Sequence, residues 1–349
     1  MDGKSSSWAC GALVLLFASG ALGCFSAPGY RGPESPHFDG SEFSNLVPTP
    51  AHSFADFLNW QLMSEPGPWS DWTESPPGPP PPRRVQGEAL RVTFVNHATV
   101  LVQVAGLNLL TDPIWSERSS PVGFAGPARV RPPGVRLEDL PPIDFVLLSH
   151  NHYDHLDVET LRVLGELSPG LRIVTGLGNA ALLAEQELPV GIELDWWQEL
   201  DLGPAVRVTA VPAQHFSGRG TDDRNQTLWL GFVVQAPGGP IYFAGDTGWG
   251  IHLAQIRKRF GPPRLALLPI APFRPCWFMS PVHLSPKGAV QAHELLGAAH
   301  SMAIHFGTFP LGDDGQEEPV TELGRALATE QVPSERFIVP GFGTGYDVL

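Results

Sequence analysis

The chain has 349 residues, of which 42% are hydrophobic and 17% are charged, so it can bury a large core and is not a disordered protein. Asp and Glu number 36 against 22 Lys and Arg, which gives a formal charge of −14. This balance leaves no basic excess for the phosphate backbone of nucleic acid, and it argues equally against electrostatic docking on anionic lipid.

A targeting segment is predicted at residues 1–24. Residues 8–22 form a 15-residue apolar run, too short for a comfortable membrane span and about right for a signal peptide. The run ends in Ala21-Leu22-Gly23-Cys24, which resembles the lipobox of bacterial lipoproteins with its usual Leu and Ala in reversed order. We therefore expect an exported, membrane-anchored bacterial lipoprotein lipidated on Cys24, with a periplasmic or secreted protein, or a retained anchor, as the alternatives.

Residues 25–88 are predicted to form a tether and lead-in, because Gly, Pro and Ser are frequent there. Residues 75–82 read SPPGPPPP, which favours an extended polyproline II spacer; a ligand for a proline-binding module is the alternative. Within this segment, residues 51–63 carry Phe and Leu at helical spacing. They predict a short amphipathic helix that packs on the main body or lies on a lipid surface.

The main body, residues 89–349, is predicted to be one α/β domain, because strand and helix patterns interleave along it. The strand patterns cover residues 91–95, 99–104, 107–111, 145–148, 172–175, 206–211, 228–234, 241–244, 265–268 and 302–304. The helical patterns cover residues 158–167, 180–186, 251–260 and 286–296. The last helix has Ser285 as a candidate N-cap and Pro286 in its first turn.

The stretch SHNHYDHLD, residues 149–157, holds three His and two Asp directly after an apolar strand pattern. In extended backbone His150 and His152 project the same way, and Asp154 and His155 can face a second point after a turn. These are nitrogen and oxygen ligands of the kind that zinc prefers. The alternative is a loop that is rich in His by chance, which is hard to reconcile with only 12 His in the whole chain.

Further candidate ligands follow three later strand patterns: His215, Asp246 and His305. One His at a strand end is usually structural, but together these three complete the coordination of two metal ions. The ligand types suit zinc, and iron or manganese would also fit them.

The pattern HxHxDH, with a distant His, a Gly-Asp and a last His, resembles the metallo-β-lactamase superfamily of binuclear hydrolases. A narrower likeness extends from about Arg91 to Val339 and is similar to the N-acyl-phosphatidylethanolamine-hydrolysing phospholipase D family. The segments that carry it are FVNHATVLVQV, LTDPIW, LPPIDFVLLSHNHYDHLD, IELDWW, YFAGDTGW, RFGPPRLALLPIAPFRPCWFM and MAIHFGTF. The resemblance implies an αβ/βα sandwich of two mixed sheets with outer helices and two Zn²⁺ at one edge.

It also implies a role for each matching residue. One zinc would be held by His150, His152 and His215, and the other by Asp154, His155 and His305, with Asp246 as the bridge. Asp112 would support the metal loop.

Catalytic roles would fall to Asp154, Asp246 and His283, although His283 could instead cap the turn before Ser285. Tyr153 and Arg219 would contact the substrate headgroup or phosphate, unless Tyr153 only packs and Arg219 is an ordinary surface residue. His97 is interpreted as a hydrogen-bonded turn residue. The candidates for an apolar approach to the site are Trp196, Trp197, Trp229, Trp249 and residues 276–279.

The implied reaction is phospholipase D-type hydrolysis of N-acyl phosphatidylethanolamine at a membrane surface, which yields N-acylethanolamine and phosphatidic acid. A homodimer is common in the family. Two other classes stay open: a binuclear hydrolase of a lactone or a soluble phosphodiester, and a lipoprotein that binds metal or lipid without turnover. The intact ligand set argues against the second.

Overall fold

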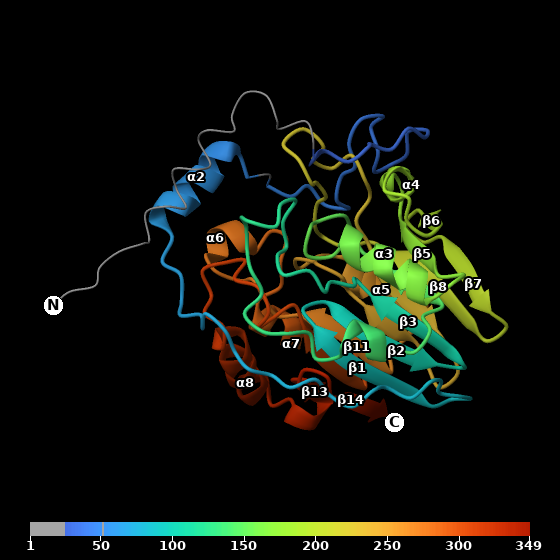
Figure 1. The fold of residues 1–349 in the computed structure, drawn as a ribbon. Coiled ribbons are helices and arrows are strands. Elements are labelled where there is room, and N and C mark those ends of the chain that lie inside the picture. The colour runs from blue at the N-terminus through green and yellow to red at the C-terminus, as the bar shows by residue number, and fades with distance from the viewer. Residues whose placement is uncertain (1–24, 51) are drawn as a thin grey trace.

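The computed structural model describes residues 25–50 and 52–349 (Figure 1). The expected signal segment, Cys24 included, therefore lies outside the described residues. None of the helices in the described ranges is both long and apolar enough to cross a membrane.

Two seven-stranded mixed sheets form the centre of the molecule (Figure 1). The first has the order β14-β1-β2-β3-β4-β5-β6 and the second the order β13-β12-β11-β10-β9-β8-β7. The first comprises β1 (Leu90–Asn96), β2 (Thr99–Val104), β3 (Leu107–Thr111), β4 (Phe145–Leu147), β5 (Arg172–Gly176), β6 (Gly191–Leu194) and β14 (Gly345–Val348). The second comprises β7 (Glu199–Gly203), β8 (Val206–Val211), β9 (Gly231–Gln235), β10 (Ile241–Phe243), β11 (Leu265–Pro269), β12 (His300–Ile304) and β13 (Phe337–Ile338).

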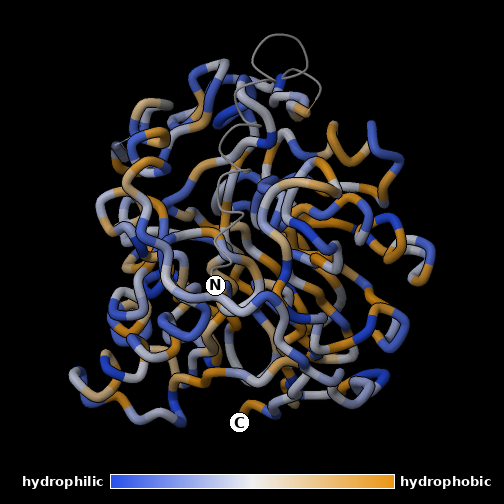
Figure 2. Tube along the Cα trace, turned by 60° about the vertical axis from the view of Figure 1, so that its left-hand side comes forward, coloured by the Kyte–Doolittle hydropathy of each residue, from blue (hydrophilic) through white to orange (hydrophobic). Residues whose placement is uncertain are grey.

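The main core lies between the two sheets. Phe94 of β1 and Phe232 and Phe243 of the second sheet belong to one cluster of buried side chains. A smaller cluster, which includes Leu161 and Leu164, lies between the first sheet and its covering helix. Most central strands are buried on both faces and carry long apolar runs, which appear as orange tube in the interior in Figure 2.

Most helices lie outside the two sheets (Figure 1), and three of those that the structure describes begin at a residue whose side chain caps them. The described helices are α2 (Phe54–Met63), α3 (Val158–Leu167), α4 (Asn179–Glu185), α5 (His252–Phe260), α6 (Cys276–Met279), α7 (Pro286–Leu296) and α8 (Glu318–Glu330), with 3₁₀ turns η2 (Leu137–Asp139) and η3 (Ser334–Arg336). Asp157 caps α3 and Ser285 caps α7 by accepting a hydrogen bond from the amide three residues on. The expected sandwich of two mixed sheets with outer helices is confirmed.

The sequence patterns missed the less apolar elements. Four strands escaped them, β6, β7, β13 and β14, and so did helices α6 and α8. β6 and β7 are largely half-buried or exposed at the sheet edges, and α8 buries only a narrow stripe, so each gives a weak periodic signal. The pattern at residues 228–234 begins too early, because the Leu228 and Leu230 amides donate to Leu177 and Ser149 of the first half instead of to a neighbouring strand.

The lead-in corrects the expectation of a tether, because residues 25–50 and 52–88 contact the sandwich at several points. Phe38 and Phe43 are part of the main core. The Trp60 indole donates to Asp313, and the Gly78 amide in the proline-rich run donates to the Gly134 carbonyl. Aromatic side chains spaced along a Pro- and Gly-rich segment thus anchor it, which composition alone concealed. The short helix expected here is confirmed as α2.

Candidate metal centre

The topology brings the predicted ligands to one edge of the sandwich. β3 and β4 are parallel, so Asp112 and the 149–155 loop leave the first sheet at the same edge. β10, β11 and β12 are parallel in the second sheet, which places Asp246 and His305 together. The turn after β1 faces the same edge, because β1 and β2 are antiparallel to each other and β2 is antiparallel to β3.

Three imidazoles form the first group of candidate ligands: His150, His152 and His215. His152 Nδ1 lies 2.8 Å from His150 Nε2 and 3.3 Å from His215 Nε2. Burial lowers the pKa of His152 to about 4 and holds the pKa of the other two well below the usual range. Neutral imidazoles offer nitrogen lone pairs, and three that converge this closely form a suitable ligand set for a metal cation.

The second nitrogen of two of these rings is already engaged. His215 Nδ1 lies 3.0 Å from the Val282 carbonyl oxygen, and His150 Nδ1 lies 2.8 Å from Ser149 Oγ. Such contacts fix the orientation of a ligating imidazole and leave its Nε2 for the metal.

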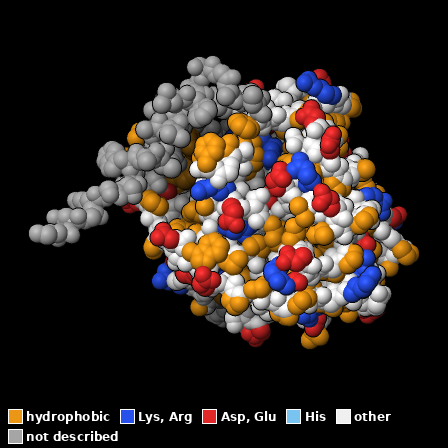
Figure 3. Space-filling model, viewed as in Figure 1, with side chains coloured by type: hydrophobic (Ala, Val, Ile, Leu, Met, Phe, Trp, Pro, Cys, Tyr) orange, Lys and Arg blue, Asp and Glu red, His pale blue; other side chains and the backbone are white. Residues whose placement is uncertain are grey.

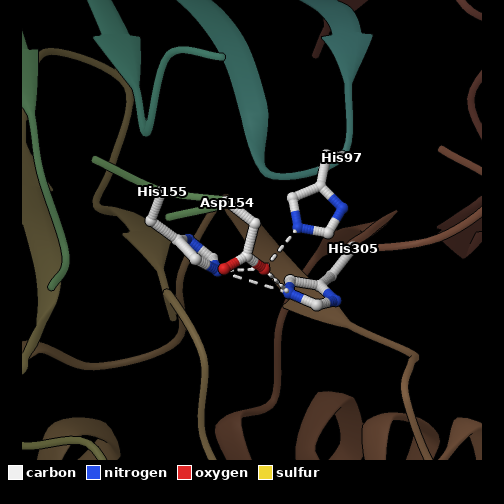
Figure 4. A group of neighbouring side chains, drawn as sticks. All are labelled: His97, Asp154, His155 and His305. Carbon is white, nitrogen blue, oxygen red and sulfur yellow. Dashed lines mark hydrogen bonds and ion pairs between the residues drawn. The ribbon is translucent and has the colours of Figure 1, made fainter. Parts of the chain in front are cut away.

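The second group surrounds the Asp154 carboxylate (Figure 4). Asp154 Oδ2 lies 3.3 Å from both His155 Nε2 and His305 Nε2, and these two nitrogens are 3.3 Å apart. Burial opposes charge on His305, but the Asp246 and Asp154 carboxylates outweigh it and raise its pKa to about 9. The two buried carboxylates thus favour a positive charge between them. A protonated His305 supplies this charge in the metal-free protein, and a divalent cation would supply it when bound.

Asp246 stands between the two groups. Its Oδ2 lies 3.1 Å from His305 Nε2, 3.3 Å from His155 Nε2 and 3.8 Å from His215 Nε2. Its Oδ1 is buried and has no hydrogen-bond partner within the described ranges. A carboxylate that reaches both groups and keeps one buried oxygen unpaired fits the position of a bridge between two metal ions.

Asp112 has the supporting position that the resemblance implied. It directly follows β3, and its carboxylate accepts hydrogen bonds from the Ser149 amide (2.7 Å) and hydroxyl (2.6 Å). The same carboxylate lies 2.6 Å from His155 Nδ1. Both oxygens therefore contact the metal loop, which is the position of a supporting residue. Burial raises the pKa of this carboxyl even though His155 and Ser149 favour its charged form.

His97 is a hydrogen-bonded turn residue, as the sequence predicts, but one of its partners belongs to the site and was not foreseen. It does sit in the turn after β1, but its Nε2 lies 2.9 Å from Asp154 Oδ2 (Figure 4). Burial lowers its pKa to about 3. His97, Asp112 and His305 all adopt positive φ, at 47°, 30° and 62°, which is uncommon for residues other than glycine and typical of functional sites. The sequence does place this His in the turn between the first two strands, and that turn lies at the same sheet edge as the candidate ligands.

We expect His97→Asn to lower metal affinity and turnover about 10- to 100-fold, the usual effect of losing a group that orients a metal ligand. Asn tolerates a positive φ, so the turn should survive. Metal content after dialysis, measured beside the thermal melting of the metal-free protein, tests this. Wild-type metal affinity in the variant would show that the Asp154 contact is dispensable.

His283 points into the site. Its Nδ1 lies 3.7 Å from Asp246 Oδ2 and, in the part of the chain that the structure covers, has no hydrogen-bond partner. The helix that follows is capped by Ser285, so His283 is not needed as a cap. Burial lowers its pKa to about 4, which keeps the ring neutral near pH 7.

Tyr153 and Arg219 contact each other. The guanidinium carbon lies 3.8 Å from the centre of the Tyr153 ring, and Arg219 Nη1 donates to the carbonyls of Asn151 (2.8 Å) and Leu156 (2.9 Å). Arg219 therefore braces the metal loop, a role that its sequence position did not reveal. Contact of either residue with a substrate stays a prediction.

The tryptophans predicted for an apolar approach divide into two sets. Trp196 and Trp229 are core residues, and Trp197 is half-buried. Trp249, three residues after Asp246, and Trp277 in α6 are exposed. Only the second set is available to a ligand.

Comparison with known proteins agrees with this geometry. Residues 107–306 match the family described as "Beta-lactamase superfamily domain". The chain is 39% identical over 265 residues to N-acyl-phosphatidylethanolamine-hydrolyzing phospholipase D 1 of Caenorhabditis elegans, covering 73% of this chain and 74% of the relative. It is 35% identical over 224 residues to the mitochondrial enzyme of that name in Saccharomyces cerevisiae, covering 62% of this chain and 47% of the relative.

A similar fold is seen in a possible metal-dependent hydrolase of Veillonella parvula. The TM-score is 0.59 at 16% identity, and the match covers 75% of this chain and all of that one (100%). At this identity the likeness shows the fold alone.

Proposed function

The chain belongs to the beta-lactamase superfamily and is a metal-dependent hydrolase, and within it we propose a phospholipase D that converts N-acyl phosphatidylethanolamine into N-acylethanolamine and phosphatidic acid. The observation that carries the proposal is the convergence of seven His and Asp side chains in a chain so similar to the nematode enzyme of that name. Zinc is the proposed metal, because five imidazoles and two carboxylates form the donor set and zinc favours imidazole.

When bound, two zinc ions would polarise a phosphoryl oxygen and supply hydroxide near neutral pH. The protein's own groups then have separate tasks. Asp154 is engaged with the surrounding imidazoles, whereas His283 keeps an unpartnered nitrogen among the described residues. His283 is therefore the better placed of the two to take a proton from water and to pass it to the departing alkoxide.

Exposed apolar side chains support a phospholipid substrate at a membrane surface. Leu62 and Met63 at the end of α2 are 84% and 74% exposed, and Trp249 and Trp277 are each 47% exposed. α2 packs beside α6 through Trp60 and Phe278, whose ring centres are 4.8 Å apart. The face seen in Figure 3 carries hydrophobic side chains interspersed with scattered acidic and basic ones. Apolar insertion, and not a basic patch, would hold this acidic protein on lipid.

We further propose export and lipidation on Cys24, and a homodimer as in the family. If Cys24 is lipidated, the catalytic body would lie close to the membrane, because the chain docks only three residues later. The Ala27 amide donates to Asp223 at a distance of 2.7 Å. Three residues span at most about 10 Å, so the loop that carries Arg219 would face the lipid headgroups.

Mass spectrometry of the products tests the proposal. Protein from Phe25 onward, loaded with zinc, is incubated with vesicles that contain N-acyl phosphatidylethanolamine among other phospholipids. We expect N-acylethanolamine and phosphatidic acid in equal amounts, abolished by a chelator and restored by zinc. Intact lipids despite two bound metals would overturn the substrate assignment and direct a screen toward lactones and soluble phosphodiesters.

A further inference from the structure

The lead-in lies along the loop that carries His215. In Figure 1 the dark-blue segment runs beside the yellow loop. The Tyr30 amide donates to the Gln226 carbonyl (2.8 Å), and the Phe43 amide donates to the Asn225 carbonyl (2.7 Å). A segment expected to lie outside the catalytic domain therefore contacts one of its metal-bearing loops directly.

One lead-in side chain holds the metal ligand itself. Asn45 Oδ1 accepts the His215 amide (3.1 Å), and Asn45 Nδ2 donates to the His215 carbonyl (2.9 Å). The same amide group also accepts from the Trp229 indole (2.9 Å) and donates to Thr49 Oγ1 (3.0 Å). Its donor and acceptor are both used, so a single side chain clamps both backbone polar groups of His215.

The clamp complements a second contact on the ring. The Val282 carbonyl lies 3.0 Å from His215 Nδ1 and sets the orientation of the imidazole, whereas Asn45 sets the position of the backbone that bears it. The Asn45 side chain is itself held in place, because it accepts a hydrogen bond from Trp229, which is almost fully buried. Both the backbone position and the ring orientation of a ligating His must be fixed if its Nε2 is to stay directed at a metal.

We propose that Asn45 is a positioning residue for the metal ligand His215, so that the lead-in is a functional part of the metal centre. The proposal rests on the metal site of the proposed function but not on its lipid substrate. Removing the clamp should weaken the metal ion in the His150, His152 and His215 group and leave the ion in the Asp154 group in place.

The central variant is Asn45→Ala. The lead-in should stay docked in it, because Phe38 and Phe43 remain buried in the core. Titration with Zn²⁺ against a chromophoric chelator, and the absorption spectrum of the Co²⁺ form, report each ion separately. We expect one ion to bind as in the wild type and the other about 10- to 100-fold more weakly. With a model phosphodiester, we expect kcat to fall and KM to change little.

Asp39→Ala is the matched control. The Asp39 carboxylate accepts from the Ser41 and Glu42 amides within an exposed turn of the lead-in, at 2.8 Å each. This variant should be less stable and still bind both ions normally. A general loosening of the lead-in would weaken metal binding in both variants and would overturn the specific role of Asn45.

Thr49→Val tests the same proposal if Asn45→Ala does not fold. The Thr49 hydroxyl accepts from Asn45 Nδ2 (3.0 Å) and from Gln214 Nε2 (2.9 Å), so its loss should weaken the same ion by a smaller factor. Unchanged affinity for both ions in a folded Asn45 or Thr49 variant overturns the proposal. If the wild type itself binds fewer than two ions, the metal assignment fails instead.

Discussion

Replacing Asp246 with Asn is expected to leave the fold intact and to remove activity by about a thousandfold or more, because the variant loses the charge between two metal positions. Asp246 Oδ2 lies 3.1 Å from His305 Nε2, 3.3 Å from His155 Nε2 and 3.8 Å from His215 Nε2. Asn has the same shape, but its amide is neutral and offers a single oxygen. The bound metal should therefore be lost together with turnover.

Two measurements separate this result from misfolding. The metal content of the purified variant, by elemental analysis, should fall below that of the wild type. Its melting temperature without metal should fall only modestly below that of the metal-free wild type, because the isosteric amide keeps the packing and only the charge beside His155 and His305 is lost. Full activity in Asp246→Asn would refute a mechanism that depends on two metal ions.

Local patterns predict the apolar inner strands and the candidate ligands, but they miss the four edge strands β6, β7, β13 and β14. The candidate ligands stand in loops that leave apolar strands, as His305 does directly after β12, and a strand end is visible in a short window of sequence. Because parallel strands end at a common edge, the order of strands and helices already predicts that these side chains meet. The paired sheets confirm that prediction.

Contacts between distant segments were not predictable in this way. Asn45 lies 170 positions before His215, and His97 lies 211 positions before Thr308, whose hydroxyl accepts the His97 amide. Nothing in the neighbourhood of Asn45 distinguishes it from a surface residue of a Pro- and Gly-rich segment. The contacts of Arg219 with the metal loop are hidden for a related reason, since its partners there are backbone carbonyls and carry no sequence signal.

The structure also explains why amino-acid composition wrongly predicts a tether for the lead-in. Composition averages over a segment, whereas docking depends on a few side chains such as Phe38, Phe43 and Trp60. Burying an aromatic side chain stabilises a folded segment by roughly 2–3 kcal/mol, so a few such residues outweigh many flexible ones. Docking of the lead-in therefore depends on where its aromatic residues lie and not on how many it has.

Asp112→Ala is expected to have the largest effect on stability, a loss of roughly 3–5 kcal/mol in the free energy of unfolding, because it removes one partner of a buried charged network. The Ser149 amide, the Ser149 hydroxyl and His155 Nδ1 would all lose their acceptor in a region closed to water. Urea denaturation of the metal-free protein, followed by fluorescence, measures the change. A loss below about 1 kcal/mol would show that water or a neighbouring group replaces the carboxylate.

Asp112→Asn supplies the control, because it keeps the shape and one acceptor, and Asn tolerates the positive φ of this position. It should lose much less stability than the Ala variant, while metal affinity falls in both because His155 is no longer held by a carboxylate. The contrast with Asp246 is informative. Removing a bridging ligand should abolish metal binding with little effect on the metal-free fold, whereas removing the support beneath the loop should weaken both. A stability change at Asp246 equal to that at Asp112 would mean that the two carboxylates share one structural role.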